Sequence, residues 1–144
     1  MMMEKLDSVL FYYIEKAIKS YRQFAQRELK NAGLTITVDQ WLTLNYLNEN
    51  PDITQKELAE AVFKDTASIT RIIELLVKAK YLKRNIHKED RRKSNLVITE
   101  QGQDTIKAAA VVVNNYRKQA LKGIGIAKED HVKMVMKTII NNCK

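Results

Sequence analysis

Residues 54–99 decide the fold, and they read TQKELAEAVFKDTASITRIIELLVKAKYLKRNIHKEDRRKSNLVIT. The first four residues, 54–57, form a capping box, in which the Thr hydroxyl and the Glu carboxylate can satisfy free amides at the start of a helix. This pattern predicts a helix of about two turns. Its buried side is expected to consist of Leu58, Ala59 and Val62.

A second helix is predicted after a tight turn at residues 63–65, because Asp65 or Thr66 can cap it. Apolar residues at helical spacing form one stripe along this helix: Ile69, Ile72, Ile73 and Leu76. Polar residues occupy the other side: Thr66, Thr70, Arg71, Glu74 and Lys78. The second helix therefore has one apolar face and one polar face.

After Lys80 the hydrophobic period changes from helical to alternating. Residues 81–86 and 95–99 alternate and predict two short strands. Between them, residues 87–93 form a polar hairpin tip that carries four Lys and Arg side chains. This part of the chain is therefore predicted to be two helices joined by a tight turn, followed by a basic hairpin.

The regions on both sides of this unit are predicted to be helical. Residues 6–33 have apolar residues at helical spacing and end at a glycine that can terminate a helix. A shorter helix begins at a capping box, residues 37–40, and ends before Pro51. Thr99 can cap a long helix that is broken at residues 123–125, and a last helix follows.

The expected fold is mainly α with a small β-hairpin wing. Residues 36–99 form a winged helix-turn-helix, and residues 1–35 and 100–144 form a helical dimerisation region. The apolar stripes of these outer helices have no predicted partner in their own chain. A second copy commonly covers such a stripe, so we expect a homodimer.

Charge and composition exclude several classes of protein. The 144 residues carry a net charge of +8, and residues 54–99 hold eleven Lys and Arg against six Asp and Glu, whereas residues 1–53 hold six against seven. This asymmetry favours an acidic polymer as partner. The sequence has no signal peptide and no transmembrane segment, so a cytoplasmic protein with no membrane partner is expected. A phosphate loop, a paired nucleophile and a metal-ligand cluster are all missing, so neither an enzyme nor a cofactor is expected.

These features predict binding to double-stranded DNA, because a helix fits the major groove and its first residues reach base edges. The candidate contacts from the second helix and its turn are Lys64, Thr66, Ala67, Ser68, Thr70 and Arg71. Thr54 and Gln55, at the start of the preceding helix, could hold a phosphate. The hairpin adds Arg84, Lys88, Asp90, Arg91, Arg92 and Lys93, with Asp90 expected to pair with Arg84 or with an arginine of the tip.

The sequence resembles the multiple antibiotic resistance regulator (MarR) family of winged-helix regulators over nearly its whole length. The matching motifs are Leu58-Ala59, residues 67–71 (ASITR), 81–84 (YLKR), 89–93 (EDRRK) and 96–102 (LVITEQG). The resemblance implies a dimer that binds a pseudo-palindromic operator, usually as a repressor. It also implies release by a small anionic or phenolic ligand bound between the dimer helices and the DNA-reading unit.

Three departures from the family pattern limit what carries over. Lys80 stands where the family usually has a glycine that ends the recognition helix, and a left-handed lysine there costs on the order of 1 kcal/mol. The single cysteine, Cys143, is near the C-terminus, whereas the oxidation sensors of the family carry theirs near the N-terminus. The only histidines are His87 and His131, in different elements. Neither peroxide nor zinc sensing is therefore expected.

A ligand pocket and the type of DNA binding stay open at the level of sequence. Aromatic side chains that could line a pocket are Tyr12, Tyr13, Tyr21 and Trp41, although aromatic residues at helical spacing are more often part of a core. Two alternatives to a sequence-specific regulator are a winged-helix module that binds protein and a nonspecific architectural DNA binder.

Overall fold

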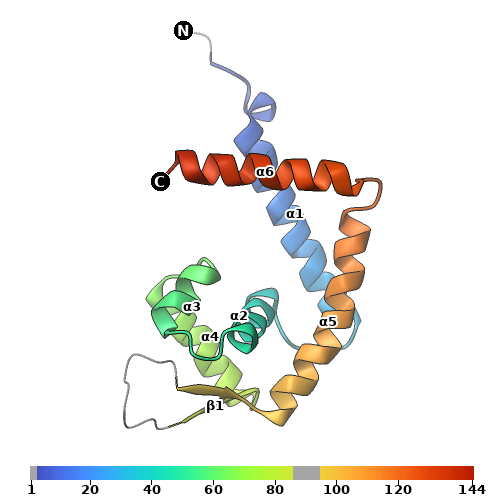
Figure 1. The fold of residues 1–144 in the computed structure, drawn as a ribbon. Coiled ribbons are helices and arrows are strands. Elements are labelled where there is room, and N and C mark those ends of the chain that lie inside the picture. Colours follow the sequence, from blue (N-terminus) through green and yellow to red (C-terminus); the bar gives the residue numbers. More distant parts are fainter. Residues whose placement is uncertain (1–2, 86–94) are drawn as a thin grey trace.

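The computed structural model describes residues 3–85 and 95–144. Along these residues the elements are a 3-10 turn (Leu6–Ser8), α1 (Leu10–Asn31), α2 (Val38–Glu49), α3 (Gln55–Ala61), α4 (Thr66–Lys78), β1 (Leu82–Arg84), β2 (Leu96–Ile98), α5 (Glu100–Ala120) and α6 (Ile126–Asn142). Helices α2 to α4 and the hairpin form a compact lobe, while α1 and α5 contact each other and extend away from it, and α6 follows α5 (Figure 1). The predicted fold class is confirmed. None of the described helices is long and apolar enough to cross a membrane.

Side-chain caps start most of these helices where the sequence places them. Thr37 and Gln40 form the full predicted capping box of α2. Asp65 rather than Thr66 caps α4, because its carboxylate accepts the Ser68 N–H at 2.7 Å. Thr99 caps α5 by accepting the Gly102 N–H at 3.0 Å.

Two predicted helix starts differ from the structure. The box at Thr54 is only half formed: its hydroxyl accepts the Glu57 N–H, but the Glu57 carboxylate accepts a hydrogen bond from that hydroxyl instead of from the Thr54 N–H. The expected helix over residues 6–33 is interrupted at Val9, whose backbone is extended, so α1 begins only at Leu10. Gly33 has a φ of +80° and occupies the predicted left-handed position just after the helix.

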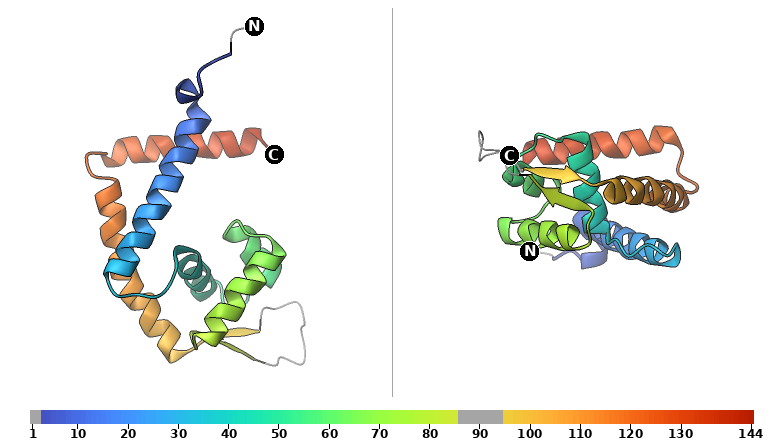
Figure 2. Two further views of the ribbon diagram at one scale, coloured as in Figure 1. Left: turned by 180° about the vertical axis from the view of Figure 1, so that it is seen from behind. Right: turned by 90° about the horizontal axis from the view of Figure 1, so that it is seen from below.

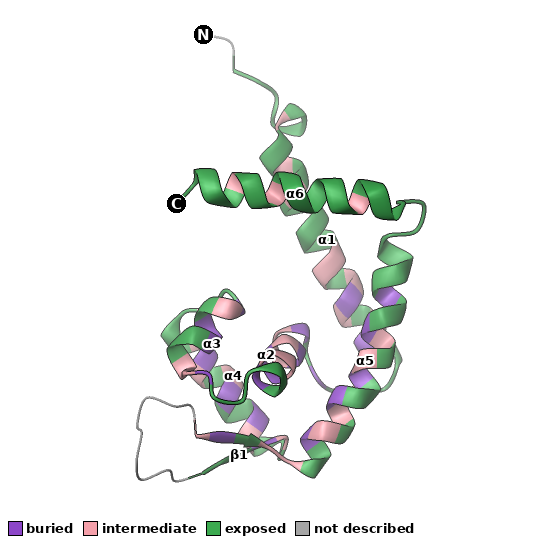
Figure 3. Ribbon diagram, in the orientation of Figure 1, coloured by how far each residue is buried: buried purple, intermediate pink, exposed green. Residues whose placement is uncertain are grey.

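The core of the lobe lies between α2, α3 and α4. Ile69, Ile73 and Leu76 of α4 are completely buried, and Ile72 is half-buried, which confirms the predicted stripe. Leu58 of α3 is also completely buried. Buried residues are concentrated in this lobe, in the last part of α1 and along α5 as far as Tyr116 (Figure 3).

The hairpin is joined to α4 and to α5 by a tight set of contacts. Strands β1 and β2 pair antiparallel, with Leu82 opposite Ile98. Lys80 has a φ of 68°, so the left-handed backbone considered for this position is present. The Lys80 carbonyl accepts the Thr99 hydroxyl at 2.6 Å, and the Tyr81 carbonyl accepts the Thr99 N–H at 3.1 Å. The start of α5 is thereby fixed to the end of α4.

The upper half of α1 and all of α6 leave apolar side chains exposed. Helix α6 has no buried residue, and the first buried residue of α1 is Ala25. The two views of Figure 2 show the long helices extending away from the lobe. Exposed apolar residues of this region include Leu6, Leu10, Phe11, Ile18, Ile126, Val132, Met134 and Ile140.

Gly102 is expected to be essential for the packing of α5 against the hairpin. A Cβ at this position would overlap the Tyr81 carbonyl oxygen and lie 2.8 Å from Ile98 Cγ2. Gly102→Ala should lower the free energy of unfolding by about 1–3 kcal/mol, which urea denaturation would measure. The control is Gly125→Ala, where nothing lies within 4 Å of an added Cβ. Equal effects of the two substitutions would contradict this view.

Lys80→Gly is expected to stabilise the fold. Glycine removes the cost of the left-handed backbone, and its larger entropy in the unfolded chain offsets part of the gain, so the free energy of unfolding should rise by up to about 1 kcal/mol. Lys78→Gly, in the right-handed backbone of α4, should instead lower it by about 1 kcal/mol. A loss of stability in Lys80→Gly would show that the lysine side chain makes a contact that outweighs the strain.

Candidate DNA-binding surface

The polar face of α4 is the centre of the candidate surface. Burial of the apolar stripe directs the opposite side of the helix outward: Thr66, Ala67 and Arg71 are exposed, and Ser68 is half-buried. All four lie in the first two turns of α4. Because the N-terminal residues of a helix in the major groove reach base edges, these side chains are the candidates for contacts with DNA.

Asp65 sets where α4 begins and is exposed beside this surface. Hydrogen bonds from the Ser68 backbone N–H and the Ser68 side chain hold the pKa of the Asp65 carboxyl below its ordinary value. The carboxylate therefore stays ionised at neutral pH and keeps accepting the Ser68 N–H. Its contribution to stability is present above the unfolded pKa and is lost as the pH falls through the folded one.

Three residues predicted to contact DNA form hydrogen bonds within the protein. Gln55 donates its side-chain N–H to the Thr70 hydroxyl at 3.0 Å, and that hydroxyl donates to the Thr66 carbonyl at 2.8 Å. The Thr54 hydroxyl is used by Glu57. Gln55 and Thr70 therefore hold α3 against α4. The two residues are 15 positions apart in the sequence, so local sequence patterns could not predict their contact.

The hairpin is described only at its base. Arg84 ends β1 and is exposed, and the Asn85 N–H donates to the Asn95 carbonyl at 2.6 Å. The other residues predicted for this part of the surface lie outside the described residues: Lys88, Asp90, Arg91, Arg92 and Lys93. The predicted pairing of Asp90 lies outside them as well.

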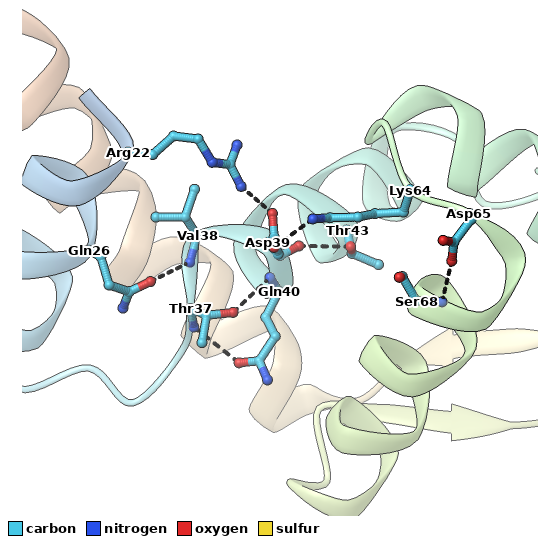
Figure 4. A network of polar contacts seen from close by, with 10 residues as sticks. All are labelled: Arg22, Gln26, Thr37, Val38, Asp39, Gln40, Thr43, Lys64, Asp65 and Ser68. Carbon is cyan, nitrogen blue, oxygen red and sulfur yellow. Dashed lines mark hydrogen bonds and ion pairs between the residues drawn. The ribbon is translucent and has the colours of Figure 1, made fainter. Parts of the chain in front are cut away.

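Lys64, in the turn before α4, is held by a carboxylate that the sequence did not single out as functional. Its Nζ lies 3.0 Å from Oδ2 of Asp39, and Arg22 of α1 bonds to Oδ1 of the same carboxylate (Figure 4). Asp39 is the second residue of α2. One side chain thus joins three parts of the chain, and the sequence signal was no more than an acidic residue in the first turn of a helix.

The four aromatic residues predicted to line a pocket do not share one. Tyr13 and Tyr21 line an apolar cavity of about 700 Å³ between α1, the end of α5 and α6. Tyr12 instead lies beside Lys16, whose Nζ is 5.8 Å from its ring centroid. Trp41 is buried in the core of the lobe, because α2 packs with this side inward.

One wall of the cavity adjoins an aromatic cluster. Tyr21 lies edge to face with Tyr116, with ring centroids 5.7 Å apart, and Phe24 contacts Tyr116 in the same manner at 6.4 Å. Burial, with Tyr21 close by, raises the pKa of Tyr116 to about 12, so this phenol is neutral at physiological pH. Among the described residues, no group of three or more His, Cys, Asp and Glu could hold a metal ion.

Comparison with known proteins identifies this arrangement. Residues 32–93, which comprise α2 to α4 and β1, match the model of the MarR family. This part of the chain is similar to the MarR family. The chain is 24% identical over 119 residues to the HTH-type transcriptional regulator BilQ of Clostridium symbiosum, an alignment that covers 83% of this chain and 81% of BilQ. Both similarities are to transcription regulators and not to enzymes.

Solved structures of MarR-type regulators share the whole fold. A MarR/EmrR family regulator from Acinetobacter sp. ADP1 has a TM-score of 0.86 at 21% identity, covering 97% of this chain and 98% of that protein. BpsR of Bordetella bronchiseptica, whose DNA binding is regulated by 6-hydroxynicotinic acid, has a TM-score of 0.84 at 16% identity, with coverage of 96% and 97%. These similarities extend over α1, α5 and α6 as well as the winged helix.

Proposed function

We propose that this protein is a MarR-family homodimeric repressor that binds a pseudo-palindromic DNA operator in the cytoplasm. The polar face of α4 carries the proposal, because a buried stripe and an Asp65 cap present Ala67, Ser68 and Arg71 together on the outside. Arg71 has the planar fork that pairs with guanine, and Ala67 is small enough to contact a thymine methyl group.

Charge supports DNA as the partner. The excess of Lys and Arg over Asp and Glu lies in residues 54–144, which include most of the winged helix. A protein-binding surface would instead have apolar side chains at the centre of its contact area. On this view the exposed Arg84 and the basic hairpin tip contact the phosphate backbone beside the groove that α4 occupies.

Exposed surface supports a dimer. The accessible area of the chain is 11101 Å², whereas a compact monomer of 16.7 kDa would expose about 7,600 Å². Much of the apolar part lies on α6 and on the first half of α1. A second copy that packs these helices against their counterparts would place the two α4 helices on one face of the assembly.

A small phenolic effector fits the same region. The cavity near Tyr13 and Tyr21 is within the usual size of small-molecule sites and is mainly apolar. Its lining includes Tyr13, Tyr21 and Ser20 but no Lys or Arg, which favours a phenolic over an anionic ligand. Because the cavity lies on the side that we assign to the dimer, the partner's helices would complete its wall.

Selection of bound duplexes from a random DNA pool at near-physiological salt tests the proposal. An inverted repeat with half-sites about one helical turn apart is the expected result. Binding without a consensus would favour a nonspecific architectural protein. No binding at all would favour a protein-interaction module.

Arg71→Ala should weaken binding to the selected duplex by about 1–3 kcal/mol and relax the preference at particular base pairs, because a bidentate contact to a base is lost. Lys107→Ala, on α5, removes the same charge away from α4 and is the control. Titration of each protein variant against the selected duplex and its single-base variants would measure the affinity and the base preference. A uniform loss across all duplexes would mean that Arg71 contacts only phosphate.

Val132→Glu should shift the protein from dimer to monomer in sedimentation equilibrium, because a carboxylate on the apolar face of α6 cannot be desolvated cheaply. Lys137→Glu, an exposed charged position on the same helix, is the control and should stay dimeric. A monomeric wild-type protein at micromolar concentration would contradict the homodimer.

A further inference from the structure

We propose that Asp39 is a positioning residue for DNA recognition, which transmits the position of α1 to the first turn of α4 through its ion pairs with Arg22 and Lys64. Asp39 itself would not contact DNA. The inference rests on the proposed function of α4 as the DNA-reading helix. It adds a residue that neither the sequence motifs nor the polar face of α4 indicated.

The geometry gives the carboxylate one partner on each side. Its Oδ1 bonds to the Arg22 guanidinium on α1, and its Oδ2 lies 3.0 Å from Lys64 Nζ in the turn between α3 and α4. Figure 4 shows Asp39 between these two cations, which reach it from opposite directions. Arg22 is 17 positions before Asp39 in the sequence, and Lys64 is 25 positions after it. Together the two ion pairs connect α1 to the turn before α4.

The backbone around Asp39 is fixed as well, so its side chain has a defined origin. The Gln26 side-chain oxygen on α1 accepts the Val38 N–H at 3.0 Å. The Asp39 carbonyl accepts the Thr43 hydroxyl at 2.7 Å, and Thr43 is completely buried. A movement of α1 would therefore act on the first turn of α2 at two points, Val38 and Asp39.

On the other side, Lys64 is placed to orient the start of α4. It directly precedes Asp65, the residue that caps α4, and its own N–H donates to the Ala59 carbonyl of α3 at 2.8 Å. Phe63, just before it, has a φ of 61°, a backbone conformation that L-residues rarely adopt. The turn is thus tightly constrained, and a shift of the Lys64 ammonium would move Asp65 and the first turn of α4.

Stability alone does not account for the arrangement. The side chains of Arg22, Asp39 and Lys64 are all about a third exposed, and ion pairs with this exposure add little to the free energy of folding. The ion pairs can still fix orientation. A carboxylate between two cations restricts the positions of both side chains, even when the pairs add little to the free energy of folding. Lys64 is also prevented from neutralising a phosphate while it is paired with Asp39.

Affinity of the full-length protein for its selected duplex and for a random duplex tests the inference. Asp39→Asn should lower the ratio of the two affinities by about fivefold or more, a typical size for coupling between sites. Affinity for the random duplex should stay the same or rise, because Lys64 is released toward phosphates. The midpoint of thermal unfolding should hardly change.

Arg22→Gln supplies the decisive comparison, since Arg22 lies on α1 and acts on α4 only through Asp39. It should lower the same ratio, and the double variant with Asp39→Asn should be no worse than Asp39→Asn alone. Arg27→Gln, on the same helix and with the same loss of charge, should leave the ratio unchanged. Additive effects of the two substitutions would overturn the inference.

Failure of this inference can be told apart from failure of the proposed function. A wild-type protein that prefers its selected duplex, together with an Asp39→Asn variant that keeps the full preference, would overturn only the role of Asp39. A large fall in the unfolding midpoint of Asp39→Asn, with a matching loss on both duplexes, would also overturn it, because the role would then be structural. A wild-type protein without any preference would overturn both.

Discussion

Burial of one apolar stripe of α4 is the constraint on which the rest of the structure depends. Ile69, Ile73 and Leu76 are completely enclosed by α2, α3 and the hairpin, so the rotation of α4 about its own axis is fixed. That rotation decides which side chains face outward, and it places Arg71 outside and Thr70 against Gln55. In such a close-packed interior, the loss of even one methylene disturbs the packing. The core behind α4 therefore determines which side chains form its outer face.

Local patterns predicted the fold well because they reflect local physics. A capping residue, a helical stripe and an alternating strand each involve neighbours within a few positions, and Thr37, Asp65 and Thr99 all cap as expected. The break at Val9 was missed, because the helical spacing of apolar residues continues through it. Whether Glu57 reaches the Thr54 amide or its hydroxyl depends on a side-chain rotamer, and a motif does not specify that.

The candidate site was predicted less completely, because its contacts join distant parts of the chain. Periodicity places Gln55 and Thr70 on polar faces but cannot show that the two faces meet. The same limit hid Asp39, whose partners are in α1 and in the turn before α4. Aromatic residues were the least informative: Tyr13 and Tyr21 share a cavity, while Trp41 is a core residue on another helix. Residue type alone marks all of these aromatic side chains as possible ligand contacts. Only the packing distinguishes those that line a cavity from those that are buried in the core.

Helix α5 has a mechanical consequence that follows from its length. It is one unbroken helix of 21 residues, so its ends are about 30 Å apart. One end is fixed to the hairpin by Thr99 and by the close approach at Gly102, and the other end leads to α6. A stiff rod of about 30 Å acts as a lever, and a tilt of about five degrees displaces its far end by about 3 Å. In the proposed dimer, the distance between the two lobes would therefore change with small rotations at the far ends of the two α5 helices.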